Sequence, residues 1–360
     1  MDVQPPMQPE QVYGYVDEVA ETEATTFLIS PYLAMVMNFP SKHVRMLGMG
    51  EDEETTQRIQ REGVEETGKG TLARTALNLK ALVDAGHDPL KLVIDRAREK
   101  GLETFISVRL NEVHWVNEPD TYPYNLIISR FWKEHPQYWI GKPNDPLPEL
   151  HQEILGKRTS PVVYGWLPGG LNFALPEVRE WRLTQIQEFL DRYDVDGIEL
   201  DFQRFPMYFK HEEAEQHLDT MTGFVQEVRN RTVEASQKRN HPILLSVRTM
   251  AKVEQNRQLG LDVSRWAKEG LVDFVVASHY LRNDFDLPIQ AYREILPEGF
   301  PLYGSIEVEQ SEERYRELAT ELHKNKVDGI YLFNYFTSRE RGVEPDFDLA
   351  RELGKRPAGE

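Results

Sequence analysis

Short runs of β-branched and aromatic residues alternate along the chain with longer segments in which apolar residues recur at helical spacing. Most of these runs end in polar residues, as strands bounded by turns and loops do. We predict eight strands, at Thr25–Ser30, Glu103–Arg109, Val162–Phe173, Val195–Asp201, Ile243–Arg248, Val272–Ser278, Pro301–Ile306 and Gly329–Phe333. The run at 162–173 has the weakest strand pattern of the eight.

Helical segments separate the later strands. We predict helices at Pro176–Arg192, His211–Gln237, Val263–Glu269 and Ser311–Lys324. Strands that alternate with helices and are apolar along most of their length indicate a parallel sheet covered by helices, an α/β fold. Eight strands favour a closed (β/α)8 TIM barrel over an open sheet, and no glycine-rich phosphate loop of the dinucleotide-binding kind follows any strand.

Two connections are unusually long. Residues 38–88 follow the first predicted strand and residues 110–170 follow the second. Long loops in compact domains are usually functional, and the loops after the strands form the active-site face of a barrel. No internal repeat or linker marks a second domain, so we predict that residues 1–360 form a single catalytic barrel with long loops after strands one and two.

Composition narrows the class of protein. Hydrophobic residues make up 40% of the chain and charged residues 28%, as in a globular protein with a sizeable core. The net charge of −18 argues against nucleic acid and anionic membrane as partners. The absence of cysteine excludes disulfides and cysteine-bound metal. We expect a secreted or periplasmic protein whose signal peptide lies outside this sequence.

The segment DVDGIELDFQRFP at 194–206 carries the strongest chemical signal. Side chains alternate along a strand, so Glu199 and Asp201 share one face, which in a barrel points inward. Inward carboxylates are unfavourable unless they are hydrogen-bonded, paired or used in function. Asp201 stands at the carboxyl end of the strand, where barrel enzymes place catalytic residues. The competing interpretation is a buried ion-pair network with inward arginines.

This segment resembles the strand-four signature of the family 10-like group of glycoside-hydrolase-like (β/α)8 barrels, which reads Asp-Gly-Ile, two residues, Asp, two residues, Arg-Phe-Pro. Further matching segments are FISVRLNEVHW (105–115), FWKEHPQYW (131–139), LNFALPEVREWRL (171–183), GLDVSRWAKEGLVDFVVASHY (260–280) and DGIYLFNY (328–335). In its strand-four motif and its length the chain also resembles the endo-fucanases of glycoside hydrolase family 168. The resemblance implies a barrel that acts on carbohydrate.

The same strand resembles the Asp-Gly-Ile-Asp-Leu-Asp-Trp-Glu strand of family 18 chitinases, with one departure. Gln203 stands where the chitinase acid would be. An amide cannot donate a catalytic proton, so we do not expect chitinase-type substrate-assisted chemistry, and Asp201 must take a different role.

Glycoside hydrolysis usually requires two carboxyl groups. Glu112, Glu254 and Glu307 follow predicted strands and are the candidates for the second one. The larger clan of barrel hydrolases typically places its pair on strands four and seven, which favours Glu307. The resemblance to family 168 implies a glutamate after strand five, which favours Glu254. We predict Asp201 as the nucleophile and Glu254 as the acid/base, with Glu307 and Glu199 as alternatives.

Polar and aromatic residues at the strand ends and in the long loops are predicted to bind substrate. They are Arg109, Asn111, His114, Trp115, Trp166, Arg204, Arg248, His279, Tyr280, Arg282 and Asn334. Arginine suits sulfate or carboxylate groups, and aromatic rings can stack on sugars. The histidines show no metal-ligand spacing, so we predict no catalytic metal and no other cofactor.

These features predict a glycoside hydrolase that is endo-acting and retaining and that cleaves an anionic polysaccharide such as a sulfated fucan. The anionic substrate is inferred from several arginines that converge on one rim of an acidic protein. Two alternatives stay open. One is a non-catalytic carbohydrate-binding barrel in which Gln203 marks lost activity, and the other is a polysaccharide lyase-type enzyme that uses arginine and histidine on a uronate.

Overall fold

A parallel sheet forms the centre of the computed structural model, which describes residues 3–65, 71–157, 159–284, 286–307, 311–335 and 344–354. Its strand order is β1-β4-β5-β6-β7-β8-β9, and every neighbouring pair is parallel. The strands are β1 (Thr26–Ile29), β4 (Glu103–Arg109), β5 (Gly197–Asp201), β6 (Leu244–Met250), β7 (Phe274–Ser278), β8 (Leu302–Ile306) and β9 (Gly329–Leu332). The predicted parallel α/β sheet is confirmed. Two short strands, β2 (Tyr32–Leu33) and β3 (Val36–Met37), form a separate antiparallel pair.

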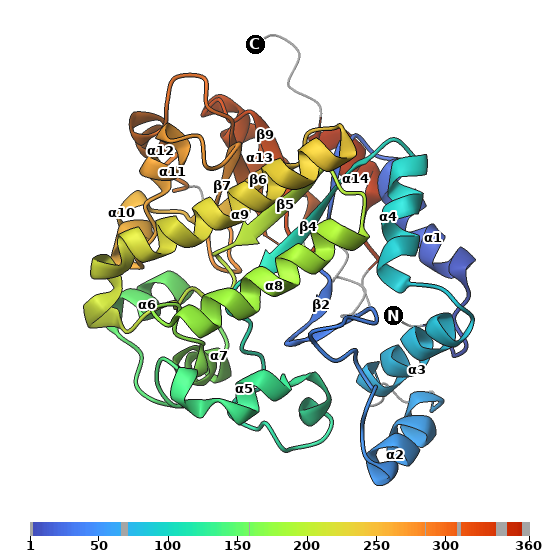
Figure 1. Ribbon diagram of the computed structural model, residues 1–360. Helices are drawn as coiled ribbons and strands as arrows, with labels where there is room; N and C mark the ends of the chain where they lie inside the picture. The colour runs from blue at the N-terminus through green and yellow to red at the C-terminus, as the bar shows by residue number, and fades with distance from the viewer. Residues whose placement is uncertain are drawn as a thin grey trace.

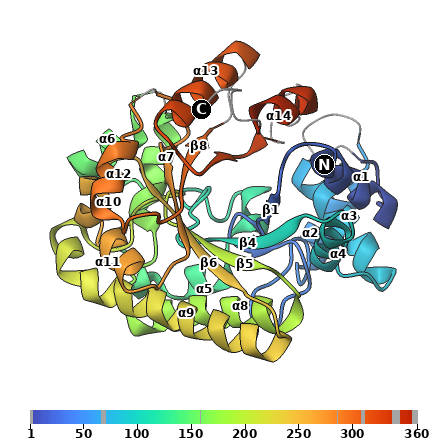
Figure 2. The same cartoon turned by 90° about the horizontal axis from the view of Figure 1, so that it is seen from above.

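Helices cover the outside of the sheet. The longest are α8 (Pro176–Arg192) and α9 (Leu218–Arg239), which lie side by side against its convex face (Figures 1 and 2). The others are α1 (Pro9–Ala20), α2 (Glu53–Gly63), α3 (Thr71–Asp84), α4 (Pro89–Glu99), α5 (Arg130–Glu134), α6 (Glu149–Leu155), α7 (Pro161–Trp166), α10 (Val253–Gln258), α11 (Val263–Lys268), α12 (Ile289–Ile295), α13 (Glu312–Lys324) and α14 (Phe347–Leu353). Among the described helices, none is long and apolar enough to cross a lipid bilayer.

The predicted strand at 162–173 is wrong. This segment forms α7 and a 3-10 turn at Leu167–Gly169, and only an isolated bridge links Leu171 to Trp139. Pro161 occupies the first turn of α7, where its fixed φ suits a helix, and the Pro-Gly-Gly sequence at 168–170 disfavours a strand. β4 therefore pairs directly with β5. The described residues form a curved sheet of seven strands in place of the predicted eight (Figure 2).

The two long connections fold into helices and pack on each other. Residues 38–88 contain α2 and α3, and residues 110–170 contain α5, α6 and α7. Arg45, in the first connection, donates from Nη2 to the carbonyl oxygens of Asn125, Leu126 and Ile128, at 2.7, 3.0 and 3.2 Å. One arginine thus joins both connections beside the carboxyl end of β4.

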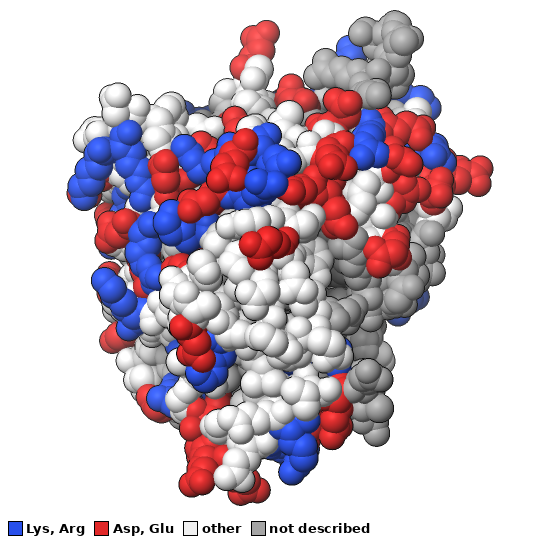
Figure 3. Space-filling model, turned by 90° about the vertical axis from the view of Figure 1, so that its right-hand side faces the viewer, with Lys and Arg blue, Asp and Glu red and all other residues white. Residues whose placement is uncertain are grey.

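Acidic and basic side chains are mixed on the surface of this acidic protein. Figure 3 shows one face of the molecule, on which lysine and arginine side chains are interspersed with aspartate and glutamate. Ion pairs along single helices contribute to this pattern, such as Lys91 with Asp95 on α4 and Arg265 with Glu269, each at 2.8 Å. Exposed pairs of this kind add little to stability, about 0–1 kcal/mol each.

Aromatic rings fill the concave face of the sheet near the amino ends of the strands. The ring centroids of Phe105 and Phe274 are 5.7 Å apart, and those of Phe274 and Tyr303 are 5.0 Å apart. Gly197, opposite Phe105 on β5, leaves room for this ring, because a Cβ there would lie 2.1 Å from Phe105. Phe105, Phe274 and Tyr303 therefore form an apolar layer, here called the aromatic floor. The polar side chains of the concave face lie nearer the carboxyl ends of the strands.

We expect Gly197→Ala to destabilise the protein by about 1–3 kcal/mol, because the added methyl group would overlap the Phe105 ring. Denaturant unfolding at equilibrium measures the change. Gly223→Ala is the matched control, because Gly223 is exposed within α9 and a Cβ there meets no atom within 4 Å. That variant should be about 1 kcal/mol more stable than the wild type. Equal stability of the two variants would show that Gly197 is not required for this packing.

Candidate active site

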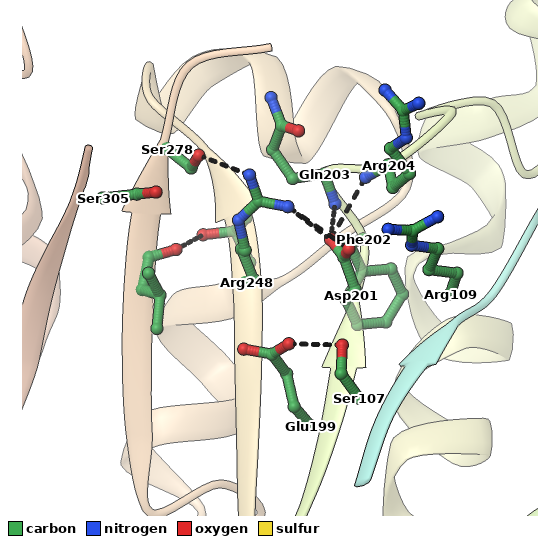
Figure 4. Close-up of polar contacts among 12 residues, drawn as sticks. Ser107, Arg109, Glu199, Asp201, Phe202, Gln203, Arg204, Arg248, Ser278 and Ser305 are labelled. Atoms are coloured by element: carbon green, nitrogen blue, oxygen red, sulfur yellow. Dashed lines mark hydrogen bonds and ion pairs between the residues drawn. The ribbon is translucent and has the colours of Figure 1, made fainter. Parts of the chain in front are cut away.

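Polar side chains line the concave face above the aromatic floor in two levels. Strand register sets Ser107, Glu199 and Ser246 side by side at the lower level. One step toward the carboxyl ends, Arg109 and Arg248 flank Asp201 in the same way. Because inward positions recur every second residue, each strand contributes one side chain to each level. Figure 4 shows the labelled members of both levels, Ser107 and Glu199 at the lower level and Arg109, Asp201 and Arg248 at the upper level.

Arg248 is at the centre of the upper level and is 0% exposed. Its Nη1 lies 3.2 Å from both carboxylate oxygens of Asp201 (Figure 4), and its Nη2 lies 2.5 Å from Oε1 of Glu307. The guanidinium also packs 3.7 Å from the centroid of the Phe333 ring. Burial opposes its charge, but Glu307 and Asp201 outweigh burial and raise the pKa of Arg248. One permanent cation thus holds two carboxylates together.

Asp201 also fixes the turn that follows β5. Its Oδ1 accepts hydrogen bonds from the backbone N–H groups of Gln203 at 3.0 Å and Arg204 at 3.1 Å. The turn continues into Phe205, whose φ of 56° is in the left-handed region that bulky residues rarely adopt. The buried ion pair that competes with a catalytic interpretation of Asp201 is therefore present, and Asp201 has a role in the backbone as well.

Glu307 directly follows β8 and is 1% exposed. Its Oε1 accepts hydrogen bonds from Ser278 at 2.8 Å and Ser305 at 3.1 Å, in addition to Arg248. Its Oε2 has no hydrogen-bond partner among the described residues. Asn283 fixes the backbone of Glu307, because it accepts from the Glu307 N–H at 2.7 Å and donates to the Glu307 carbonyl at 3.0 Å. The position of this carboxylate is thus determined, while one oxygen stays available.

Glu199 is the carboxyl group of the lower level and is 0% exposed. Its Oε1 accepts from the Ser107 hydroxyl at 2.7 Å and from the Tyr331 hydroxyl at 3.1 Å. Burial, together with the negative charge of Asp201, raises the pKa of Glu199 to about 7. Glu199 is therefore protonated below neutral pH and lies deeper than the two carboxylates that Arg248 binds.

A second polar network forms a rim beside this cluster. Arg109 donates to Oε2 of Glu112 at 3.3 Å, His114 contacts Oε1 of Glu112, and Arg204 Nη2 lies 3.0 Å from His114 Nε2. Arg204 Nη1 donates to the Tyr280 hydroxyl at 3.3 Å. Burial lowers the pKa of His114, so the neutral ring donates from Nδ1 to Glu112 and accepts from Arg204 at Nε2. Burial opposes ionisation of Glu112, but its contacts with His114, Arg109 and Arg204 outweigh burial and lower its pKa.

Aromatic rings pack next to the rim. Trp115 stacks on Tyr124 with ring centroids 3.8 Å apart and lies 5.1 Å from Trp166. The Trp166 indole N–H donates to Asn117 at 2.7 Å, and its ring is 5.3 Å from the His114 ring. The predicted sugar-stacking tryptophans therefore lie together, and one face of Trp115 is covered by Tyr124.

Other predicted substrate-binding residues have structural contacts. The Asn111 side chain accepts from the Leu171 N–H at 2.8 Å and donates to the Leu171 carbonyl at 3.0 Å, so it anchors the second long connection. Arg282 lies 3.2 Å from Asp284. Asn334 is the second residue after β9 and has a left-handed φ of 53°.

His279 directly follows β7 and lies 2.8 Å from Asp286. The ligand atoms of His279, Asp284 and Asp286 lie within 4.8 Å of one another. His279 and Arg282 already contact these two carboxylates.

The structure brings Asp201, Arg248, Glu307 and Glu199 together and leaves Glu254 apart. Glu254 is exposed in the first turn of α10, and no hydrogen bond or ion pair joins it to Asp201 or Arg248 in the described part of the chain. The sequence analysis missed the residues that hold the cluster in place. They are Ser278, Asn283, Ser305, Tyr331 and Phe333. The alternation of side chains along a strand could have indicated Ser278 and Ser305, because both occupy inward-facing positions of β7 and β8.

A curved parallel sheet with helices outside and carboxylates at the carboxyl ends of its strands defines a barrel-type α/β fold of the kind used by glycoside hydrolases. Comparison with one solved structure, at a TM-score above 0.5, supports this fold class. The chain is similar to the glycoside hydrolase domain of PgaB (BpsB) from Bordetella bronchiseptica, with a TM-score of 0.57, 9% sequence identity and coverage of 99% of this chain and 96% of that one. Alpha-L-fucosidase isoenzyme 2 from Paenibacillus thiaminolyticus gives a TM-score of 0.49 at 14% identity, covering 98% of this chain and 46% of that one. No family model matches the chain, so the resemblances to the family 10-like group and family 168 stay predictions.

The raised pKa of Glu199 predicts a pH-dependent stability difference between the wild type and Glu199→Gln. An unfolded glutamate ionises near pH 4.5, whereas Glu199 in the folded protein keeps its proton up to about pH 7. The contribution of Glu199 to the free energy of unfolding is therefore complete below the pKa of glutamate in the unfolded chain. This contribution is lost as the pH rises through the pKa of Glu199 in the folded protein. The glutamine variant never ionises and keeps an oxygen acceptor for Ser107 and Tyr331.

We expect the free energy of unfolding of Glu199→Gln, relative to the wild type, to increase by on the order of 1–3 kcal/mol between about pH 5 and about pH 8. Urea denaturation at several pH values measures this difference. A difference that stays constant across this range would show that Glu199 titrates as an ordinary carboxyl group.

Proposed function

We propose that the chain is a glycoside hydrolase whose two catalytic carboxyl groups are Asp201 and Glu307. The observation that carries the proposal is the single buried guanidinium of Arg248 that binds both groups at the carboxyl ends of β5 and β8. Because both bound nitrogens belong to one guanidinium, the carboxylates lie no more than roughly 8 Å apart. Retaining enzymes separate the two groups by about 5–5.5 Å and inverting enzymes by roughly 6.5–9.5 Å, so this limit is compatible with both.

The contacts suggest a role for each carboxyl group. Asp201 accepts hydrogen bonds from Arg248 and from two backbone N–H groups, which suits a nucleophile or a group that stabilises positive charge on the sugar ring. Glu307 has one oxygen on Arg248 and a second oxygen, Oε2, without a partner among the described residues. Oε2 is the atom that would carry the proton to the leaving oxygen. Glu307 therefore replaces Glu254 as the preferred acid/base.

Entry of a sugar requires movement of the rim. Asp201 and Arg248 are 0% exposed, whereas the side chains of Arg109 and His114 are 17% and 23% exposed. A glycan that approaches the carboxyl ends of the strands would meet Arg109 and His114 first. Displacement of these side chains would open a path to Asp201, and the nearby tryptophans Trp115 and Trp166 would flank that path.

The proposed substrate is an anionic polysaccharide such as a sulfated fucan, cleaved within the chain. Its support is the set of three arginines, Arg109, Arg204 and Arg248, on one side of the concave face. Each of them already contacts an acceptor within the protein, so a sulfate would have to replace an existing partner. Because these arginines already have partners within the protein, a neutral polysaccharide is the alternative to an anionic substrate.

One observation favours a second candidate function. Asp201 is fully buried, forms an ion pair with Arg248 and accepts a hydrogen bond from the backbone of the turn that follows β5. A residue with a purely structural role would make the same contacts. A non-catalytic carbohydrate-binding protein would retain these contacts and the aromatic residues without hydrolysis.

We expect the purified protein to release oligosaccharides from at least one member of a polysaccharide panel that includes a sulfated fucan and its desulfated form. Gel electrophoresis of the products measures cleavage. Asp201→Asn should lower turnover at least ~10³-fold because it removes the charge that acts on the sugar. Retention of wild-type turnover in Asp201→Asn would remove the central claim. Binding without product from any polysaccharide would favour the non-catalytic candidate, and equal cleavage of both fucan forms would exclude recognition of sulfate.

Azide rescue distinguishes the two candidate acid/base residues. In a retaining enzyme that has lost its acid/base, azide can replace water and restore turnover of an activated substrate. We expect Glu307→Gln to be inactive on the natural glycan and rescued by azide, because the introduced amide keeps an oxygen that accepts from Arg248. Glu254→Gln, the matched variant, should behave like the wild type because Glu254 is exposed on α10. Rescue of Glu254→Gln alone would restore Glu254 as the acid/base.

A further inference from the structure

Gln203 is a buried side chain whose polar groups are both unused. It is 0% exposed, and neither Oε1 nor Nε2 has a hydrogen-bond partner among the described residues. Its backbone N–H donates to Asp201, so the turn after β5 fixes where the side chain begins. Figure 4 shows the amide group beyond the guanidinium of Arg248, on the side of the carboxyl ends of the strands.

Such a side chain is unfavourable in a protein interior unless a ligand completes its hydrogen bonds. Buried polar atoms almost always have partners, and leaving them unpaired destabilises the folded state. A 180° rotation of the amide would not satisfy either group, because both terminal atoms lack a partner among the described residues. Met or Leu would fill the same volume without this penalty, so the amide itself requires an explanation.

We infer that Gln203 determines specificity by binding a neutral sugar group that presents a hydrogen-bond donor and an acceptor side by side. A carboxamide offers two N–H donors and one carbonyl acceptor, so it is complementary to such a group. Two vicinal hydroxyl groups have this chemistry, and so does an acetamido group. Sulfate and carboxylate only accept hydrogen bonds and would leave Oε1 of Gln203 without a donor. This inference rests on the proposed carbohydrate substrate, and on a sulfated chain it assigns Gln203 to an unsulfated position.

The location of Gln203 links this recognition to the reacting carboxylates. Oδ1 of Asp201 binds the N–H groups of Gln203 and Arg204, and Oδ1 and Oδ2 of Asp201 contact Arg248. A sugar held by the Gln203 amide would therefore lie next to the Asp201–Arg248–Glu307 cluster. Recognition of the neutral group would set the position of the ring relative to Asp201.

Gln185 on α8 provides a matched control. It is also 0% exposed, but its Oε1 accepts from Tyr32 at 3.0 Å and from Arg182 at 2.8 Å, and its Nε2 donates to the Trp181 carbonyl at 3.1 Å. Replacing each glutamine by methionine keeps a similar volume and removes the amide. The two variants therefore separate an amide that stabilises the fold from an amide that binds a ligand.

The test measures glycan binding and thermal stability of the whole chain carrying Glu307→Gln, so that turnover does not deplete the ligand. The probes are arrayed neutral oligosaccharides with free vicinal hydroxyls, their 2-acetamido counterparts and their sulfated counterparts. We expect Gln203→Met to weaken binding at least tenfold while its thermal midpoint stays the same or rises. Gln185→Met should lower the thermal midpoint and leave the affinity of the folded protein unchanged.

The pattern of retained probes identifies the group that Gln203 binds. Binding of the neutral set indicates vicinal hydroxyls, and binding confined to the 2-acetamido set indicates the acetamido group. Wild-type affinity in Gln203→Met, binding confined to fully sulfated probes, or no binding to any probe would overturn the inference. Because the readout is binding, a protein that binds these probes but cleaves no polysaccharide would disprove hydrolysis and leave the role of Gln203 intact.

Discussion

The contact of Arg248 with Asp201 and Glu307 is the interaction on which the candidate site depends. All three side chains are at most 1% exposed, so their charges are removed from water. Burial of an unpaired charge destabilises a protein strongly, whereas a hydrogen-bonded pair offsets much of the desolvation. Burial, together with the negative charge of Asp201, raises the pKa of the Glu199 carboxyl group that lies below this cluster.

Curvature of the sheet makes this contact possible. Asp201 and Arg248 lie on adjacent strands in register, but Glu307 follows β8, which is two strands away from β6. Neighbouring strands are separated by about 4.8 Å, so in a flat sheet Glu307 would lie roughly 10 Å from Arg248 along the sheet. Curling the sheet brings the inward side chains of β6 and β8 within reach of one guanidinium. The aromatic floor around Phe105 and Gly197 fills the space that this curvature encloses.

The sequence predicted the parts of the fold and site that depend on local periodicity. Strand alternation was sufficient to place Glu199 and Asp201 on the inward face, and the helix at 176–192 has the predicted bounds. The segment 162–173 was misassigned because a short apolar run suits a strand or a buried helix equally well. The choice between Glu254 and Glu307 depended on where each chain segment turns after its strand. Only the tertiary structure shows that α10 begins directly after β6 and places Glu254 at the surface.

Several buried polar atoms on the concave face have no partner among the described residues, and they bear on whether this network is purely structural. Besides Gln203, they include Oε2 of Glu199, Oγ of Ser246, Nε of Arg248 and Oε2 of Glu307, none of which has a partner among the described residues. A buried polar network that serves stability alone gains most when every member is satisfied, because the low dielectric strengthens its bonds and penalises each missing one. The Asn111 side chain fits that description, since its amide oxygen accepts from the Leu171 N–H and its amide nitrogen donates to the Leu171 carbonyl. The cluster around Arg248 does not, and its spare donors and acceptors point to a ligand that completes them. This contrast favours a site that binds sugar over a network that only stabilises the sheet.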